Sequence, residues 1–104
     1  MIKFSGMIVK RDDFTLEEFK KYWLEVHVPI MLKVPGVLHY RVNVIDRKID
    51  GNFPYDGFSE VWFESEEAMD AALASPEFDK IREDVPKFQK HIDRIMIDES
   101  VIIE

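Results

Sequence analysis

The order in which the hydrophobic pattern changes along the chain is the feature that most restricts its fold. Alternating apolar residues, which are typical of strands, occupy residues 2–9, 37–46, 58–63 and 92–98. Helical patterns begin at Thr15 and Ser65, and a further short helix begins at Pro76. The resulting order, βαββαβ with one extra short helix, predicts a ferredoxin-like α+β fold with a four-stranded antiparallel sheet and helices on one face.

The first helix carries the clearest local signals. Thr15 and Glu18 have the spacing of a capping box, in which each side chain bonds the backbone amide of the other. Pro29 lacks an amide hydrogen and crowds the preceding turn, so we expect the helix to stop or kink near residues 27–28. One apolar stripe at helical spacing should face the sheet, and its members are Phe19, Tyr22, Trp23, Val26 and Ile30.

A sheet with helices on one face leaves its other face uncovered. Two such sheets packed face to face would cover both, with Phe58, Glu60 and Trp62 as candidates for the dimer interior. The apolar residues 101–103 are a second sign of a partner, because such a tail has little reason to lie on the surface of a monomer. We therefore expect a single domain over residues 1–104 that assembles as a homodimer.

Composition excludes several functional classes. The 104 residues carry 14 basic and 21 acidic side chains, a net charge of −7 that would repel a phosphate backbone, so we expect no nucleic-acid partner. With no cysteine and no clustered ligand spacing, we expect neither a metal site nor a cofactor. The sequence shows no signal peptide and no apolar run of membrane-spanning length, which predicts a cytoplasmic protein that does not bind membranes.

His27 and Tyr40 are the residues best suited to chemistry. His27 flanks the apolar stripe near the end of the first helix, and it titrates naturally near neutral pH. Tyr40 shares a strand face with Val42 and Val44, and its hydroxyl can donate to a carbonyl or enolate oxygen. Structural alternatives stay open, namely a helix-terminal histidine bonded to the backbone and a core tyrosine with a satisfied hydroxyl. Glu60 could act as a base if desolvated, or could lie at a wet dimer interface.

Three sequence blocks resemble proteins of the EthD family. They read F-x-x-Y-W-x-x-x-H-x-P over residues 19–29, V-P-G-V-x-x-Y over 34–40 and D-G-F-x-E-x-W-F-x-S over 56–65. The resemblance implies a dimeric α+β barrel. Members of the family are encoded beside haem monooxygenase systems for ether degradation. Related proteins isomerise methyl-substituted muconolactones, and fungal relatives dehydrate or cyclise polyketides.

In the isomerase relatives, a histidine late in the first helix and a tyrosine on the second strand belong to the active site, and these positions match His27 and Tyr40. The same relatives carry a cysteine on the third strand where this chain has Val61, so a thiol-dependent step is not available here. We interpret the chain as a small cofactor-independent enzyme for hydrophobic carbonyl or lactone ring compounds, with Trp23, Val61 and Phe63 lining the pocket for this small hydrophobic molecule.

Two other interpretations remain open at the level of sequence. The chain could be a non-catalytic accessory protein that binds a product of an oxygenase-based degradation pathway. It could also be a haem or oxygen-using barrel monooxygenase, in which His27 would be the axial ligand.

Overall fold

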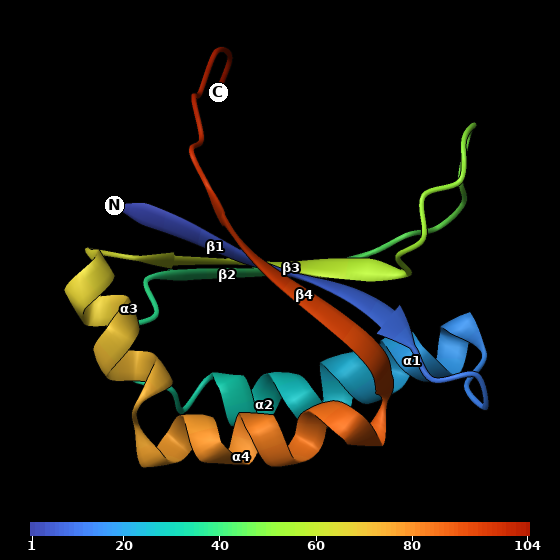
Figure 1. Ribbon diagram of the computed structural model, residues 1–104, viewed down its shortest axis with the longest axis horizontal. Coiled ribbons are helices and arrows are strands. Elements are labelled where there is room, and N and C mark those ends of the chain that lie inside the picture. Colours follow the sequence, from blue (N-terminus) through green and yellow to red (C-terminus); the bar gives the residue numbers. More distant parts are fainter.

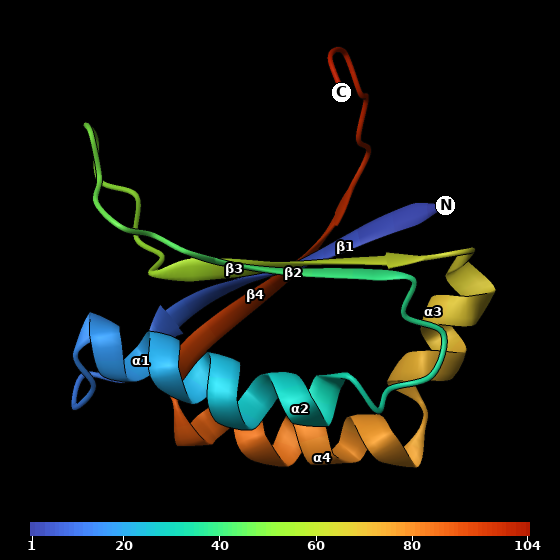
Figure 2. The ribbon, with the colours of Figure 1, turned by 180° about the vertical axis from the view of Figure 1, so that it is seen from behind.

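The computed structural model describes residues 1–104 and contains one antiparallel sheet. Its strands are β1 (Ile2–Lys10), β2 (His39–Val44), β3 (Gly57–Phe63) and β4 (Gln89–Ile97), in the order β2-β3-β1-β4. β1 and β3 therefore form the centre, while β2 and β4 form the edges. Figure 1 shows the helices on one side of this sheet, and Figure 2 shows the same arrangement from behind. The predicted ferredoxin-like α+β fold with a four-stranded antiparallel sheet is confirmed.

The first helical segment begins with the predicted capping box. The Thr15 hydroxyl accepts from the Glu18 amide at 3.1 Å, and the Glu18 carboxylate accepts from the Thr15 amide at 2.9 Å. The helix α1 (Leu16–Tyr22) then continues without interruption into a π-helical turn, η1 (Trp23–His27).

The π-helical turn bears on two expectations about this segment. The chain does not leave the helical conformation at residues 27–28; instead the helix type changes there from the π-helical turn to α2 (Val28–Met31), which has Pro29 in its first turn. The wide turn also changes which residues face the sheet. Val26, expected on the apolar stripe, is 41% exposed. The buried residues are instead four apart, and they are Phe19, Trp23, His27 and Met31.

Three shorter helical elements complete the layer below the sheet. They are α3 (Glu66–Leu73), α4 (Pro76–Asp84) and the 3₁₀-helix η2 (Val85–Lys87). Ser65 caps α3 and Ser75 caps α4, each by accepting a bond from the amide three residues later. These elements place the C-terminal end of α4 beside the first helical segment (Figure 2).

The core between helices and sheet consists of two clusters. An aromatic cluster is formed by Ile8, Phe19, Trp23 and Phe88. A larger cluster around Val61 and Phe63 lies nearer α3. Its other buried members are Met31, Val34, Met69, Ala72, Phe78 and Ile81.

The other face of the sheet carries no helix. There the Lys3 ammonium bonds Glu60 at 2.6 Å and Glu99 at 2.9 Å, and it lies 4.6 Å from the centre of the Trp62 ring. The C-terminal tail after β4 extends on this open side in both views (Figures 1 and 2). Residues 101–103 are between 67% and 92% exposed, so the apolar tail is uncovered in a single chain.

Candidate active site

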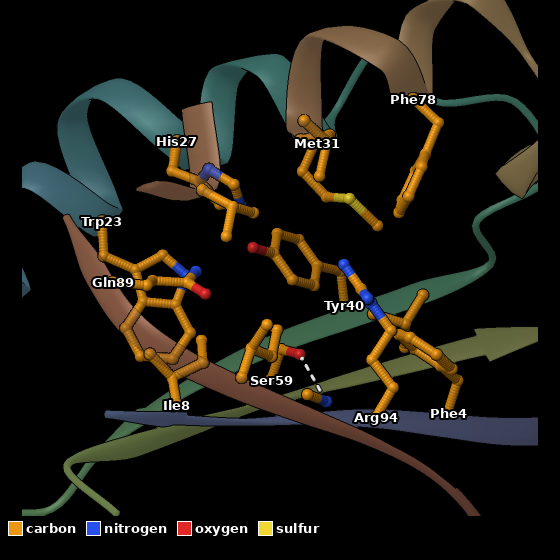
Figure 3. A pocket seen from close by; sticks show the side chains of 15 residues that line it. Phe4, Ile8, Trp23, His27, Met31, Tyr40, Ser59, Phe78, Gln89 and Arg94 are labelled. Carbon is orange, nitrogen blue, oxygen red and sulfur yellow. Dashed lines mark hydrogen bonds between the residues drawn. The ribbon is translucent and has the colours of Figure 1, made fainter. Parts of the chain in front are cut away.

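A narrow pocket lies between the two core clusters, enclosed by the sheet on one side and by the first helical segment and α4 on the other. Its volume of about 40 Å³ gives room for a few water-sized groups, so a ring compound must displace lining side chains to enter fully. Ten of the 15 lining residues are hydrophobic, Tyr40 among them, so the few side chains that carry polar atoms are the sources of specificity. These polar side chains, labelled in Figure 3, are His27, Tyr40, Ser59, Gln89 and Arg94.

His27 enters the pocket from the π-helical turn and is fixed by a carboxylate from α4. Its Nδ1 lies 2.8 Å from Oδ2 of Asp84, and only 6% of His27 and 3% of Asp84 are exposed. The Tyr22 hydroxyl donates to the other oxygen of Asp84 at 2.7 Å. Because a carboxylate accepts but does not donate, the proton of the neutral imidazole is on Nδ1. Nε2 is therefore the ring nitrogen with a free lone pair.

Burial and the neighbouring carboxylate act on His27 in opposite directions. Burial lowers the pKa of the imidazole below its ordinary value of 6.5, and this effect outweighs the hydrogen bond and charge of Asp84, which raise it. His27 is thus neutral at pH 7 in the folded protein. A neutral imidazole is the form that can accept a proton.

Tyr40 approaches the pocket from β2, opposite the helix that carries His27. Its partner across the sheet is Val61 of β3, so both side chains point toward the helices. Burial raises the pKa of Tyr40 to about 12, while the Trp23 indole acts in the opposite direction. Figure 3 shows the Tyr40 hydroxyl directed toward the end of the pocket where His27, Trp23 and Gln89 lie. At neutral pH this hydroxyl keeps its proton and can donate a hydrogen bond.

Small residues form the floor of the pocket at the centre of the sheet. Gly6 of β1 and Ser59 of β3 are direct partners in the sheet, and the Gly6 amide donates to the Ser59 hydroxyl oxygen at 3.0 Å. Arg94 of β4 is paired with Gly6 on the other side and is exposed. It is the only lining residue with a permanent charge, and no carboxylate lies within bonding distance of it.

The structure brings most of the predicted site residues together. Trp23, His27, Tyr40 and Val61 all line the pocket, whereas Phe63 is buried in the larger core cluster and is not part of the lining. Their side chains come from the π-helical turn and from two strands.

Asp84 is a member of the site that sequence reasoning missed. It follows Phe78 and Ile81 at intervals of three along α4, and both of those residues are buried. A carboxylate in line with an apolar helical stripe could have identified this site residue, because a charge at such a position is buried and needs a partner.

Glu60 has a different environment from that of a catalytic base. It lies on the open face of the sheet, where burial opposes its ionisation but bonds from Lys3 and Asn43 hold its pKa below the ordinary value.

No group of three histidine, aspartate or glutamate side chains is arranged to hold a metal ion. None of the helices combines the length and the apolar character needed to span a membrane.

The sequence profile of the EthD domain matches residues 11–91, which include the whole His27–Asp84 pair. Among solved structures, an EthD family protein from Bacillus halodurans C-125 superposes with a TM-score of 0.80 at 19% identity, covering 96% of this chain and 100% of the other. No curated protein matches the sequence.

Two further structures show how widely this fold is used. A dimeric ferredoxin-like protein of unknown function from Thermobifida fusca gives a TM-score of 0.74 at 12% identity, covering 94% of this chain and 90% of the other. A protein assigned as an antibiotic biosynthesis monooxygenase from Bacteroides thetaiotaomicron gives 0.62 at 22% identity, with coverages of 98% and 90%. At these identities the likeness shows a shared fold alone.

Proposed function

The chain belongs to the EthD domain family, and from this premise we propose that it is a small enzyme that moves a proton next to the carbonyl group of a hydrophobic ring compound. The observation that carries the proposal is the buried pair of His27 and Asp84, which presents a neutral imidazole to an apolar pocket that also contains Tyr40. A base and a hydrogen-bond donor in one desolvated pocket are the groups that enolisation requires.

In the proposed reaction, Nε2 of His27 takes the proton from the carbon beside the carbonyl. The electron pair of the broken C–H bond forms an enolate, whose oxygen receives a hydrogen bond from Tyr40. Return of the proton to a second carbon gives isomerisation. Loss of a hydroxyl group from the β-carbon, which leaves as water with that proton, gives dehydration. All the acid and base groups come from the chain itself, so we expect no cofactor.

Asp84 is the positioning residue of this mechanism. By accepting from Nδ1 at 2.8 Å it selects the tautomer in which Nε2 is the base, and its charge stabilises the imidazolium formed after proton transfer. Val61 lines the pocket at the position where isomerase relatives carry a cysteine. Its side chain adds apolar surface to the wall, and it cannot take part in a thiol-dependent step. The enzyme would therefore share the fold of those relatives and differ in its chemistry.

We also propose that the working form is a homodimer. The open sheet face, the exposed tail at residues 101–103 and the dimeric protein of the same fold from Thermobifida fusca support this assembly. A stable dimer of this kind buries roughly 2,000 Å² or more in total.

The proposal is tested by proton exchange, which requires no knowledge of the natural substrate. The protein is mixed in D₂O with cyclic ketones, cyclic enones and butenolides, and exchange beside the carbonyl is followed by ¹H NMR. We expect the wild type to accelerate exchange of at least one class, and H27Q to lose the acceleration while binding the same compounds. Binding without exchange by the wild type would favour the alternative, a non-catalytic accessory protein that holds a degradation product in the same pocket.

A further inference from the structure

Gln89 is a buried polar side chain that the proposed reaction does not use. Only 5% of the residue is exposed, it lines the pocket, and its Oε1 has no hydrogen-bond partner. A buried acceptor without a partner costs about 1–3 kcal/mol, and such groups are rare in folded proteins. The pocket therefore contains an acceptor that the protein leaves unused.

A bulge at the start of β4 is the reason that Gln89 faces the pocket. Opposite Val9 and Lys10 of β1 lie His91 and Gln89, so Lys90 is an extra residue in β4. Strict alternation would place Gln89 on the open face with His91, but the bulge turns it toward the helices.

The residue displaced by the bulge has a separate role at the surface. The Lys90 ammonium bonds the Asp12 carboxylate at 3.1 Å, and both side chains are largely exposed. Bulges often occur next to active sites, where they redirect a side chain. A local interruption of the sheet at Lys90 and an unsatisfied amide oxygen at Gln89 therefore occur at neighbouring residues.

We propose that Gln89 is a specificity-determining residue that accepts a hydrogen bond from a hydroxyl group on the ligand. This inference rests on the proposed function for its choice of a carbonyl-bearing ring, and it narrows that class to hydroxylated rings. Figure 3 places Gln89 beside Trp23 and His27, so the hydroxyl would lie at the His27 end of the pocket.

A neutral hydroxyl fits this position better than a charged donor does. The pocket lining is mostly apolar, with Ile8, Trp23 and Ile92 among its residues, and the one nearby carboxylate, Asp84, is already bonded by His27 and Tyr22. An ammonium group would lose its hydration there for one amide oxygen, at a cost of several kcal/mol. A hydroxyl reproduces the single bond that a water molecule makes to such an oxygen, whereas a methylene group cannot.

The test compares ligands and variants together. Binding of 1-tetralone and of its ring-hydroxylated isomers is measured by NMR titration with the wild type and with Q89L, which keeps the side-chain size and removes the amide. We expect at least one hydroxylated isomer to bind the wild type about 10-fold more tightly than 1-tetralone does, and Q89L to lose this preference. Thermal unfolding of Q89L should occur at the same or a higher temperature, because the substitution removes an unsatisfied buried group.

H27Q is the matched control, because it removes the base and leaves Gln89 in place. It should keep the preference for the hydroxylated isomer while losing proton exchange, so failure of the reaction and failure of the hydroxyl site are separately visible. Equal affinity of the wild type for all the tetralones, including no binding of any, would overturn the inference. So would a preference retained in Q89L, or a loss of its stability, which would show that the amide makes structural bonds.

Discussion

Nδ1 of His27 lies 2.8 Å from Oδ2 of Asp84, although 57 residues separate the two in the sequence. The bond joins the π-helical turn to the last residue of α4, and both side chains are almost fully buried. It fixes the orientation and the tautomer of the imidazole before any ligand arrives. The acid–base behaviour of His27 is therefore the most direct test of the site.

The pKa of His27 should lie below 6.5 in the folded protein, because burial outweighs the effect of Asp84. In D84N it should fall further, since the group that raises it is removed. Two-dimensional NMR of the imidazole nitrogens over pH 4–8 measures both values and the tautomer. A pKa above 6.5 in the wild type would contradict the neutral base.

The same shift predicts how His27 affects stability. Below about pH 6.5 the unfolded chain binds a proton at His27 more readily than the folded protein does, and this proton binding favours the unfolded state. The contribution of neutral His27 to the free energy of unfolding is therefore fully present above pH 6.5. It is lost as the pH falls from that value toward the lowered folded pKa. Urea unfolding at several pH values should show a smaller loss in H27Q than in the wild type between pH 6.5 and 5. An identical pH dependence in both proteins would refute the linkage.

Substitutions at the proposed base and donor should affect turnover unequally. Given a substrate, H27A should lower turnover at least roughly 10²-fold, because no other lining residue can accept the proton. Y40F should cost less, since it removes a donor and leaves the base. Steady-state kinetics with circular dichroism as the folding control measure both. A change in affinity alone would favour the accessory-protein alternative.

Alanine substitutions at two glycines should have different effects, one on the size of the pocket and the other on the stability of the fold. A Cβ at Gly6 would lie 2.9 Å from the flexible end of Ile92, so G6A should fold and narrow the pocket. A Cβ at Gly57 would lie 2.6 Å from the Trp23 ring and 2.7 Å from the Asn43 carbonyl oxygen, so G57A should lose about 1–3 kcal/mol. Thermal unfolding and ligand titration of both variants check this pair, and similar stability losses would contradict it.

The apolar tail should contribute to the dimer. The double variant I102S/I103S should weaken association and leave the fold intact, because both side chains are exposed in a single chain. I49S is the control, since Ile49 is 94% exposed but lies in the loop between β2 and β3. Sedimentation velocity over micromolar concentrations measures the association. A stable wild-type monomer would rule out the proposed dimer.

The sequence pattern predicts the fold well because strand alternation and helix caps are local. Ser65, Ser75 and the capping box at Thr15 each act within a few residues, and the helices begin where expected. The π-helical turn at residues 23–27 is different, since nothing in the spacing of apolar residues distinguishes Val26 from His27 as the inward residue. Packing against the sheet and α4 decides that question.

The site was predictable only in part for a similar reason. His27 and Tyr40 have side chains with recognisable chemistry, and the helix and the strand that carry them were predicted, although the π-helical turn at His27 was not. Asp84 becomes a partner of His27 only through the packing of two helices distant in sequence. Gln89 enters the pocket through a bulge in β4, which begins before its predicted start at residue 92, and simple alternation assigns it to the wrong face.

The separation of 57 residues between His27 and Asp84 also bears on the synthesis of the protein. On the ribosome, His27 emerges long before α4, and β4 with Gln89 and Arg94 emerges last. Until α4 is made, the imidazole of a nascent chain has no Asp84 to bond, and until β4 joins β1 the pocket lacks the lining that Gln89 and Arg94 supply. Assembly of the pocket would thus require both α4 and β4 to be in place, so it comes late in the folding of this domain.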